Sequence, residues 1–434
     1  MFKIYLILRF LLYPIFKYIL PLFSKKAASR VNFEMKNSIN VSALGRASYG
    51  FEVSSEGELE QVRFLIFHLL KMDETVEIIF CSDSVESQCL EILKKYPEQV
   101  RLLRLPILIF NPISNLNNPY EWLTCKTFFM CRYDFFPELI QYCNKNNIES
   151  ILLSANANKL NSSNIIFKSY LRNCYKSFDK IICSTSSSQK ILNRFLDKSK
   201  IKTYDFRINQ IVERLVNKNT KYTKYSSILE FTDFIRSIDE KKKMIFGSLW
   251  YSEVSLIKEL YEKVQNGFQI VVAPHVLSKK NLNNFKAFFD ENSINYQIID
   301  NENTFQGGLS GKSQVILIGH KGLLCELYSE FSFSYVGGGF GVSVHSLLEP
   351  YIGNNIIFCG PKTYRSTEYD FILEQKTNSI KKVELMSNVT KKILEGLDGN
   401  LPINNDLNSL QSNQDLSEIL LFLNLDLSED KHVE

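Results

Sequence analysis

A glycine-rich segment, residues 331–350 (FSFSYVGGGFGVSVHSLLEP), has the composition of a site for an anion beside a sugar. An apolar run leads into a glycine triplet that includes Gly338 and Gly339, and a helix is predicted to begin near Val344. Glycines let a ligand approach the backbone closely, and free N–H groups at a helix start favour a phosphate. Glu349, one turn into that helix, could accept hydrogen bonds from a ribose diol. The same residues are also compatible with a tight strand-to-helix turn that has Glu349 on a solvated face, so both interpretations stay open.

A second candidate for chemistry is the acidic stretch over residues 52–60 (EVSSEGELE), between a predicted strand and an amphipathic helix. Ser55 and Glu58 have the Ser-x-x-Glu spacing of a capping box, which satisfies free N–H groups at a helix start. The functional alternative is that Glu58 takes a proton from a hydroxyl, because a general base needs an ionised carboxylate within hydrogen-bond reach. From the residues alone, the cap is favoured.

Short polar loops follow several other predicted strands. In the second half of the chain they would lie near a nucleotide, at the carboxyl ends of strands, and they contain Ser248, Pro274, His275, Lys321, Gly322 and Leu323. His275 could pair with a phosphate, although a single histidine is more often structural. In the first half, Arg132 and Asp134 follow one strand and Arg207 follows another, either as ordinary surface charges or as residues that line a cleft.

The elements that must position these residues alternate from residue 30 onward, as in an α/β fold. Strands are predicted at residues 48–54, 76–81, 101–105, 127–131, 150–153, 180–183, 244–246, 269–273, 296–299, 315–318, 331–336 and 355–358, with helices such as 59–71 and 84–95 between them. The chain turns polar and charged between residues 216 and 243, which indicates a domain boundary. The sequence therefore predicts two Rossmann-like domains, 27–215 and 216–434, facing across a cleft, after an N-terminal segment over residues 1–26.

That N-terminal segment is almost wholly apolar from residue 2 to residue 23. Its charges, Lys3, Arg9 and Lys17, fall within roughly 120° of a helical wheel, as in a helix that lies in a membrane interface. Two prolines should kink or end the helix, and basic residues follow it, as expected on the cytoplasmic side. We expect membrane attachment, by a spanning or an interfacial helix; a core helix is the alternative.

Composition sets limits on the remaining function classes. The chain has 434 residues, a length that suits two domains, and a net charge of +4, which does not by itself indicate a nucleic-acid partner. Nine cysteines without a CxxC pair indicate reduced thiols in place of a disulfide framework or zinc site.

The order of these segments resembles the 3-deoxy-D-manno-octulosonic acid (Kdo) transferases of lipopolysaccharide synthesis, a GT-B glycosyltransferase family. The resemblance runs from the N-terminal segment to about residue 371. It rests on SSEGE (54–58), RYDFF (132–136), LSANANKL (153–160), YDFRIN (204–209), GSLW (247–250), APH (273–275), YVGGGFG (335–341), HSLLEP (345–350) and FCGP (358–361).

The resemblance implies a GT-B fold and transfer of Kdo from CMP-Kdo to a hydroxyl of a lipid A precursor, at the cytoplasmic face of the inner membrane. It implies that Glu58 is the general base of an inverting displacement, and that Arg207 and Asp134 line the cleft near the reacting sugar. No metal or other cofactor and no nucleic acid is implied. The residues that match CMP-holding segments are Ser248, Pro274, His275, Lys321, Gly322, Leu323, Gly338, Gly339, Ser346, Leu347, Leu348 and Glu349.

The chain departs from the family pattern in several places, and LSANANKL (153–160) lacks the arginine common in its equivalent. Ser346 stands for a usual Asn, Glu52 for a usual His, Asp134 for a usual Glu and Leu249 for a usual Thr. Another nucleotide-sugar donor, or a catalytically silent membrane scaffold, therefore stays open beside the Kdo transferase hypothesis. A soluble nucleotide-sugar epimerase of similar architecture fits poorly with the apolar N-terminal segment.

Overall fold

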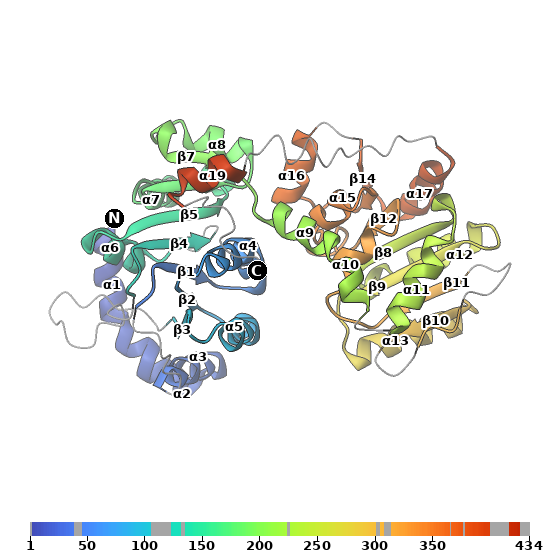
Figure 1. The fold of residues 1–434 in the computed structure, drawn as a ribbon, viewed down its shortest axis with the longest axis horizontal. Coiled ribbons are helices and arrows are strands. Elements are labelled where there is room, and N and C mark those ends of the chain that lie inside the picture. The colour runs from blue at the N-terminus through green and yellow to red at the C-terminus, as the bar shows by residue number, and fades with distance from the viewer. Residues whose placement is uncertain are drawn as a thin grey trace, which may run out of the picture. The chain divides into compact units, whose positions relative to one another are not determined.

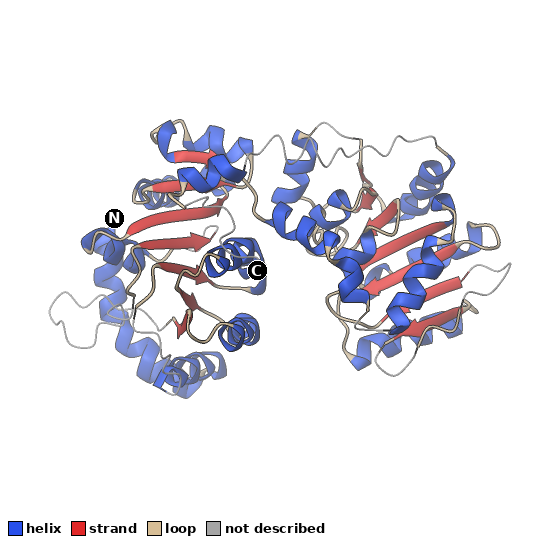
Figure 2. Cartoon of the chain, viewed as in Figure 1, coloured by secondary structure: helices blue, strands red, loops and turns tan. Residues whose placement is uncertain are grey.

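The computed structural model describes residues 2–38, 46–105, 123–131, 135–223, 226–300, 304–307, 314–364, 366–375, 378–399 and 416–425. The chain divides into two compact units, a first unit of Met1–Arg207 with Gln414–Glu434 and a second unit of Ile208–Asn413. Each unit contains one parallel sheet with helices on both faces (Figures 1 and 2).

The first unit is built on a seven-stranded sheet of order β3-β2-β1-β4-β5-β6-β7. Its strands are β1 (Tyr49–Val53), β2 (Val76–Phe80), β3 (Val100–Arg104), β4 (Thr127–Cys131), β5 (Glu149–Ala155), β6 (Lys180–Cys183) and β7 (Ile201–Thr203). One face packs on α3 (Lys25–Met35), α4 (Glu56–Lys71), α5 (Asp83–Lys95) and α19 (Leu416–Phe422), and the other on α6 (Pro137–Lys145), α7 (Ile165–Lys176) and α8 (Ser186–Leu192). Because both faces are covered, central strands such as β2 are buried along their whole length.

The second unit repeats this plan with a seven-stranded parallel sheet of order β10-β11-β9-β8-β12-β13-β14. Its strands are β8 (Lys243–Leu249), β9 (Gln269–Pro274), β10 (Tyr296–Ile299), β11 (Gln314–Ile318), β12 (Phe333–Val336), β13 (Ile356–Cys359) and β14 (Ile380–Lys382). Helices α12 (Ser255–Lys263), α13 (Lys279–Glu291) and α17 (Val389–Asp398) cover one face. The other face carries α9 (Arg207–Val216), α10 (Lys218–Tyr222), α11 (Ser226–Arg236), α14 (Leu324–Tyr328), α15 (Leu348–Ile352) and α16 (Thr367–Glu374).

The strand order identifies where a ligand is expected to bind in each unit. In the first unit β1 lies between β2 and β4, and in the second β8 lies between β9 and β12. Successive connections leave these central strands in opposite directions, which opens a crevice at the carboxyl ends of the strands. The loops after β1 and β4, and those after β8 and β12, are therefore the expected binding loops.

The structure confirms the predicted α/β class and shows where the sequence analysis was incomplete. The short edge strand β14 (IKK) was not predicted, because three residues with two polar members give no strand signal. The strand expected over residues 202–206, before Arg207, is the shorter β7 (IKT), which ends at Thr203. The helix predicted near Val344 begins only at Leu348 and is five residues long.

The unit boundary also differs from the predicted domain boundary at residue 216. The second unit already starts at Ile208, and α19 belongs to the first unit. The reason is packing: Ile208 and Ile211 of α9 are buried in the core of the second unit, whereas Ile419 and Leu420 of α19 are buried in that of the first.

The N-terminal segment forms a bent helical arm of α1 (Phe2–Pro14), a π-helical turn (Ile15–Ile19) and α2 (Leu20–Phe23), followed by α3. Arg9 of α1 forms an ion pair of 3.2 Å with the buried Glu138 of α6, which attaches the arm to the first unit. In the described residues no single helix has the length and apolarity to cross a membrane; the two segments Ile7–Phe23 and Lys25–Met35, bent by 118°, meet those two criteria only as a pair.

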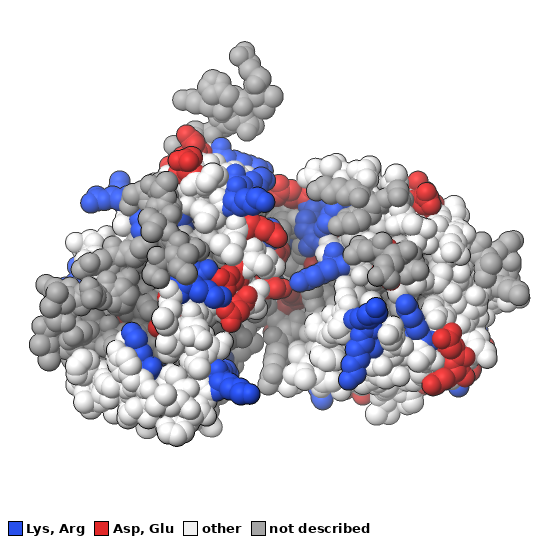
Figure 3. Space-filling model, turned by 90° about the horizontal axis from the view of Figure 1, so that it is seen from below, with Lys and Arg blue, Asp and Glu red and all other residues white. Residues whose placement is uncertain are grey.

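Charged side chains of both signs are interspersed on the visible face of each unit (Figure 3). This distribution agrees with the small net charge of +4.

Candidate active site

In the first unit, Glu58 lies in the first turn of α4, directly after the carboxyl end of the central strand β1. Ser55 is the N-cap residue, and its hydroxyl accepts a hydrogen bond from the Glu58 N–H at 3.4 Å. The Glu58 carboxylate reaches back and accepts from the Ser54 N–H at 2.6 Å. The capping interpretation is therefore correct in geometry, and the cap also holds the carboxylate at the ligand-binding edge of the sheet.

A second buried carboxylate adjoins Glu58. Glu52, the last but one residue of β1, is fully buried, and its Oε1 accepts from the Ser54 hydroxyl at 2.7 Å and from the Cys81 thiol at 3.2 Å. Burial and the neighbouring Glu52 charge raise the pKa of the Cys81 thiol well above its ordinary value, so this thiol stays protonated. Ser54 thus links the two carboxylates, with its hydroxyl on Glu52 and its N–H on Glu58.

Arg207 lies on a segment that packs against the same helix. Its guanidinium binds Asp205 through Nε at 2.9 Å and Nη2 at 2.5 Å, and Asp205 is buried. The neighbouring Phe206 stacks on Phe64 of α4, with ring centroids 6.4 Å apart. Arg207 is therefore held in one orientation, with part of its charge already balanced by Asp205.

The third catalytic candidate, Asp134, lies outside the described residues, as does Arg132. The end of β4 that precedes them is described: the Cys131 thiol lies 3.9 Å from the Glu58 carbonyl and 3.4 Å from the side-chain oxygen of Gln61. The start of α4 and the end of β4 are therefore in contact.

In the second unit, the glycine triplet after β12 forms a tight turn with a packing reason at each position. A Cβ at Gly337 would lie 2.3 Å from the Ser248 carbonyl oxygen, and one at Gly339 would lie 2.6 Å from the Gly360 nitrogen. Gly338 has a φ of +92°, in the region where side chains are strained. Its N–H donates to the buried carboxylate of Glu253 at 2.9 Å. The tight-turn interpretation is therefore sufficient to explain these glycines.

Glu253 was not identified from the sequence, although it fixes this turn. Its carboxylate also accepts from the Tyr335 hydroxyl at 3.0 Å and from the Trp250 N–H at 3.4 Å. These bonds tie the loop after β8 to the turn after β12. No local pattern around Glu253 could have revealed this role, because Tyr335 and Gly338 are 82 and 85 residues away in the sequence.

The expectation of free N–H groups at the start of the next helix is wrong in this structure. Glu368 of α16 accepts from the N–H groups of Leu347 at 2.6 Å and Leu348 at 3.0 Å, and from the Ser346 hydroxyl at 3.1 Å. A carboxylate of the protein thus occupies the position where a phosphate was expected. The side chains of Leu347 and Leu348 are buried in the core, so only their backbone could meet a ligand.

Three aromatic rings gather where β8, β9 and the glycine turn meet. Trp250 donates from Nε1 to the Nε2 of His345 at 2.7 Å, and the two ring planes differ by 13°. His275 stacks on both rings, with centroids 4.7 Å from Trp250 and 4.0 Å from His345. Trp250 keeps 39% of its surface exposed and His275 is also exposed, whereas His345 is half-buried. Of the three, only His275 was predicted as a site residue.

Burial, and to a smaller extent the neighbouring His275, lower the pKa of His345 to about 4. Burial also lowers the pKa of His275. At neutral pH the His345 imidazole is therefore uncharged and able to accept the hydrogen bond from Trp250, and neither histidine supplies a fixed positive charge to a phosphate. Ser248 and Pro274 lie on the adjoining strand ends, Ser248 with a φ of +50°.

The remaining predicted residues adjoin α14 and α15. Glu349 is the second residue of α15, and its carboxylate lies 3.7 Å from an Nη1 of Arg214. Gly322 has a φ of +84° and open space beside its Cα, Lys321 is exposed, and the Leu323 side chain is buried in the core. Among the described residues, no group of three or more His, Cys, Asp or Glu is placed to hold a metal ion.

The sequence family described as 3-deoxy-D-manno-octulosonic-acid transferase (kdotransferase) matches residues 30–205. The chain is also 24% identical over 324 residues to a bifunctional glycosyltransferase/methyltransferase of Fusobacterium nucleatum. That alignment covers 71% of this chain but 46% of the relative, so the chain spans about half the length of that protein.

Solved structures with the same architecture include enzymes of two kinds. The UDP-GlcNAc 2-epimerase from Neisseria meningitidis is 13% identical, with a TM-score of 0.54 over 87% of this chain and 99% of its own. The UGT89C1 protein of Arabidopsis thaliana complexed with quercetin is 13% identical, with a TM-score of 0.53 over 85% and 94%. At this identity the likeness shows the GT-B fold alone.

Proposed function

We propose that this chain, whose residues 30–205 match the Kdo transferase family and whose domains have the GT-B fold, transfers Kdo from CMP-Kdo to a lipid A precursor. The observation that carries the proposal is the position of Glu58. Within the unit that matches the family, its carboxylate lies at the carboxyl end of the central strand, where ligands of such sheets bind.

Glu58 is the general base of the proposed reaction. The bond from the Ser54 N–H holds the carboxylate in place, and a general base needs such a positioned carboxylate within reach of the hydroxyl. Glu58 removes the proton of the acceptor hydroxyl while the hydroxyl oxygen forms a bond to the anomeric carbon of Kdo. The bond between that carbon and the phosphate oxygen breaks on the opposite side, and CMP leaves with the electron pair. The configuration at the anomeric carbon is inverted.

Arg207 stabilises negative charge on the Kdo carboxylate or the departing phosphate in this mechanism. Its pairing with the buried Asp205 supports this role, because the guanidinium enters the reaction already oriented. However, because the guanidinium is shared with Asp205, it stabilises negative charge on the donor less than an unshared guanidinium would. We therefore expect Arg207 to contribute chiefly by orienting the donor substrate, and less by neutralising its negative charge.

The second unit holds the CMP part of the donor substrate in this proposal. The Glu349 side chain is 23% exposed, and its carboxylate could accept hydrogen bonds from the ribose hydroxyls. The exposed part of Trp250 offers an aromatic surface in the same unit. Since Glu253 and Glu368 occupy the N–H groups of the glycine turn and of α15, the phosphate must either displace one of these carboxylates or bind elsewhere in the unit.

Membrane attachment at the cytoplasmic face of the inner membrane is part of the proposal. It is supported by the large exposed fractions of Leu11 (62%), Leu22 (77%) and Phe23 (83%) in the N-terminal arm. Such apolar side chains gain free energy by entering the interface. Lys25 and Lys26 follow the arm and suit the cytoplasmic surface of an anionic membrane.

The direct test is an assay of sugar transfer by the purified full chain in detergent. Labelled CMP-Kdo and a lipid A precursor are supplied, and incorporation of label into the lipid is measured. Parallel reactions supply a panel of labelled UDP-sugars in place of CMP-Kdo. The proposal predicts incorporation from CMP-Kdo and none from UDP-sugars. Incorporation from a UDP-sugar alone would instead support a GT-B transferase with a different donor, the alternative that the departures at Glu52, Leu249 and Ser346 leave open.

A further inference from the structure

Arg214, in the last turn of α9, contacts three separate parts of the second unit. Its Nε and Nη2 bind the two carboxylate oxygens of Glu326 at 2.8 and 3.0 Å. Nη2 also donates to the Gly322 carbonyl at 3.2 Å, and Nη1 lies 3.7 Å from a carboxylate oxygen of Glu349. One side chain therefore joins α14, the loop that precedes it and α15.

The pair with Glu326 fixes the orientation of Arg214. The Glu326 side chain is 1% exposed, and a two-bond contact between planar groups allows little rotation. Burial raises the pKa of the Glu326 carboxyl, but the bonds and charges of Arg214 and Lys221 outweigh it and hold the pKa below its ordinary value. Glu326 is thus ionised and holds Nη1 toward Glu349.

We propose that Arg214 is a positioning residue of the nucleotide site, which aligns Glu349 to accept hydrogen bonds from a ribose diol. The proposal rests on the proposed function, which places CMP in this unit. Gly322 and Glu349 are both members of the segments predicted to hold CMP, and Arg214 contacts both.

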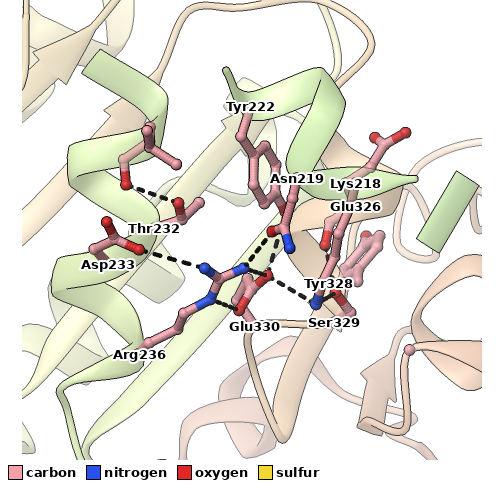
Figure 4. Close-up of polar contacts among 12 residues, drawn as sticks. Lys218, Asn219, Tyr222, Thr232, Asp233, Arg236, Glu326, Tyr328, Ser329 and Glu330 are labelled. Carbon is pink, nitrogen blue, oxygen red and sulfur yellow. Dashed lines mark hydrogen bonds and ion pairs between the residues drawn. The ribbon is translucent and has the colours of Figure 1, made fainter. Parts of the chain in front are cut away.

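Glu330, two residues after the end of α14, offers a matched comparison. Arg236 binds both of its carboxylate oxygens, at 2.8 and 2.9 Å, and Lys218 binds it at 2.9 Å (Figure 4). Arg236 therefore repeats the two-bond arginine–glutamate pair of Arg214. In the described part of the chain, however, Arg236 forms no ion pair with Glu349. Arg236→Gln controls for the loss of a structural pair without a change at the proposed ribose site.

The experiment compares the affinities of CMP and 2′,3′-dideoxy-CMP for each variant of the full chain. The ratio of the two dissociation constants on one variant does not depend on the folded fraction, so partial unfolding does not disturb it. We expect Arg214→Gln to weaken CMP binding about tenfold and dideoxy-CMP binding less than about twofold, equivalent to about 1.0–1.4 kcal/mol of ribose-dependent binding. Arg236→Gln should leave the ratio as in the unchanged chain.

A second comparison isolates the route through Glu349. If Arg214 acts by aligning Glu349, then Glu349→Gln and the double variant Arg214→Gln/Glu349→Gln bind CMP equally. Equal losses for CMP and dideoxy-CMP in Arg214→Gln, or a further loss in the double variant, would overturn the role of Arg214 and leave the proposed function intact. If the unchanged chain binds neither nucleotide, the proposed function fails and this inference fails with it.

Discussion

The Ser54 N–H donates to the Glu58 carboxylate at 2.6 Å, while the Ser54 hydroxyl donates to Glu52 at 2.7 Å. One serine thus sets the positions of two buried carboxylates at the end of the central strand. A helix cap and a general base are usually separate interpretations of the same glutamate. In this loop they are compatible, because the cap restricts the carboxylate to one place.

The cap itself makes a prediction about stability. Ser55→Ala removes the hydroxyl that accepts from the Glu58 N–H, and we expect it to lower the free energy of unfolding by about 1 kcal/mol. Urea denaturation of the full chain measures this. Ser55→Thr, which keeps an accepting hydroxyl, is the matched control, and its free energy of unfolding should fall much less. Equal losses in both variants would show that the hydroxyl does not cap α4.

The carboxylate of Glu368 makes a second prediction about stability. Glu368→Ala leaves the N–H groups of Leu347 and Leu348 and the Ser346 hydroxyl without their acceptor. We expect a loss of about 1–3 kcal/mol in the free energy of unfolding, because buried donors without a partner are costly. Glu395→Gln in α17, a surface residue paired with Lys392, should leave the unfolding midpoint nearly unchanged. An equally small effect of Glu368→Ala would contradict the capping role.

The hydrogen bond between Trp250 and His345 should respond to acid at an unusual pH. Protonated His345 cannot accept from the indole, and its pKa of about 4 lies well below the ordinary value of 6.5. In a Trp122→Phe variant, which leaves Trp250 as the remaining one of two tryptophans, the fluorescence should change with a midpoint near pH 4. A midpoint near 6.5, or the same transition in His345→Phe, would contradict this assignment.

The same histidine gives a pH dependence of stability with a defined sign. Between pH 6.5 and about 4 the unfolded chain binds a proton at His345 that the folded chain does not. The contribution of neutral His345 to stability is therefore complete above pH 6.5 and decreases as the pH falls toward 4. The melting temperature of the unchanged chain should fall more steeply through this range than that of His345→Gln. Parallel curves of melting temperature against pH for the two proteins would argue against a lowered pKa of His345.

Much of the fold could be predicted from the sequence, because parallel strands buried on both faces give continuous apolar runs, as in Val315–Ile318 of β11. The position of Glu58 after β1 could also be predicted, since the cap and the strand are local patterns. The carboxylates of Glu253 and Glu368 could not be predicted. Each acts on backbone N–H groups far away in the sequence, 85 residues for Glu253 and Gly338, and no local spacing records such a contact.

The N-terminal arm makes a prediction about membrane binding. Leu22→Glu and Phe23→Glu together place charge on the most exposed apolar part of α2. Binding to vesicles with anionic lipids, measured by flotation, should fall about tenfold or more, since each buried apolar side chain is worth about 1.5–3 kcal/mol. Leu421→Glu, which changes a leucine of α19 that is 71% exposed, should leave binding unchanged. Equal binding by all variants would show that the arm does not mediate membrane attachment.

The central claim is that Glu58 is the general base, and the most direct test is the rate of Kdo transfer by Glu58→Gln in a single turnover. The amide keeps the shape of the side chain and can still accept from the Ser54 N–H, but it cannot take a proton. Glu56→Gln, in the same first turn of α4, is the matched control. We predict that Glu58→Gln binds CMP-Kdo as before and transfers about two to four decades more slowly, with Glu56→Gln unaffected. An undiminished transfer rate in Glu58→Gln would contradict the account.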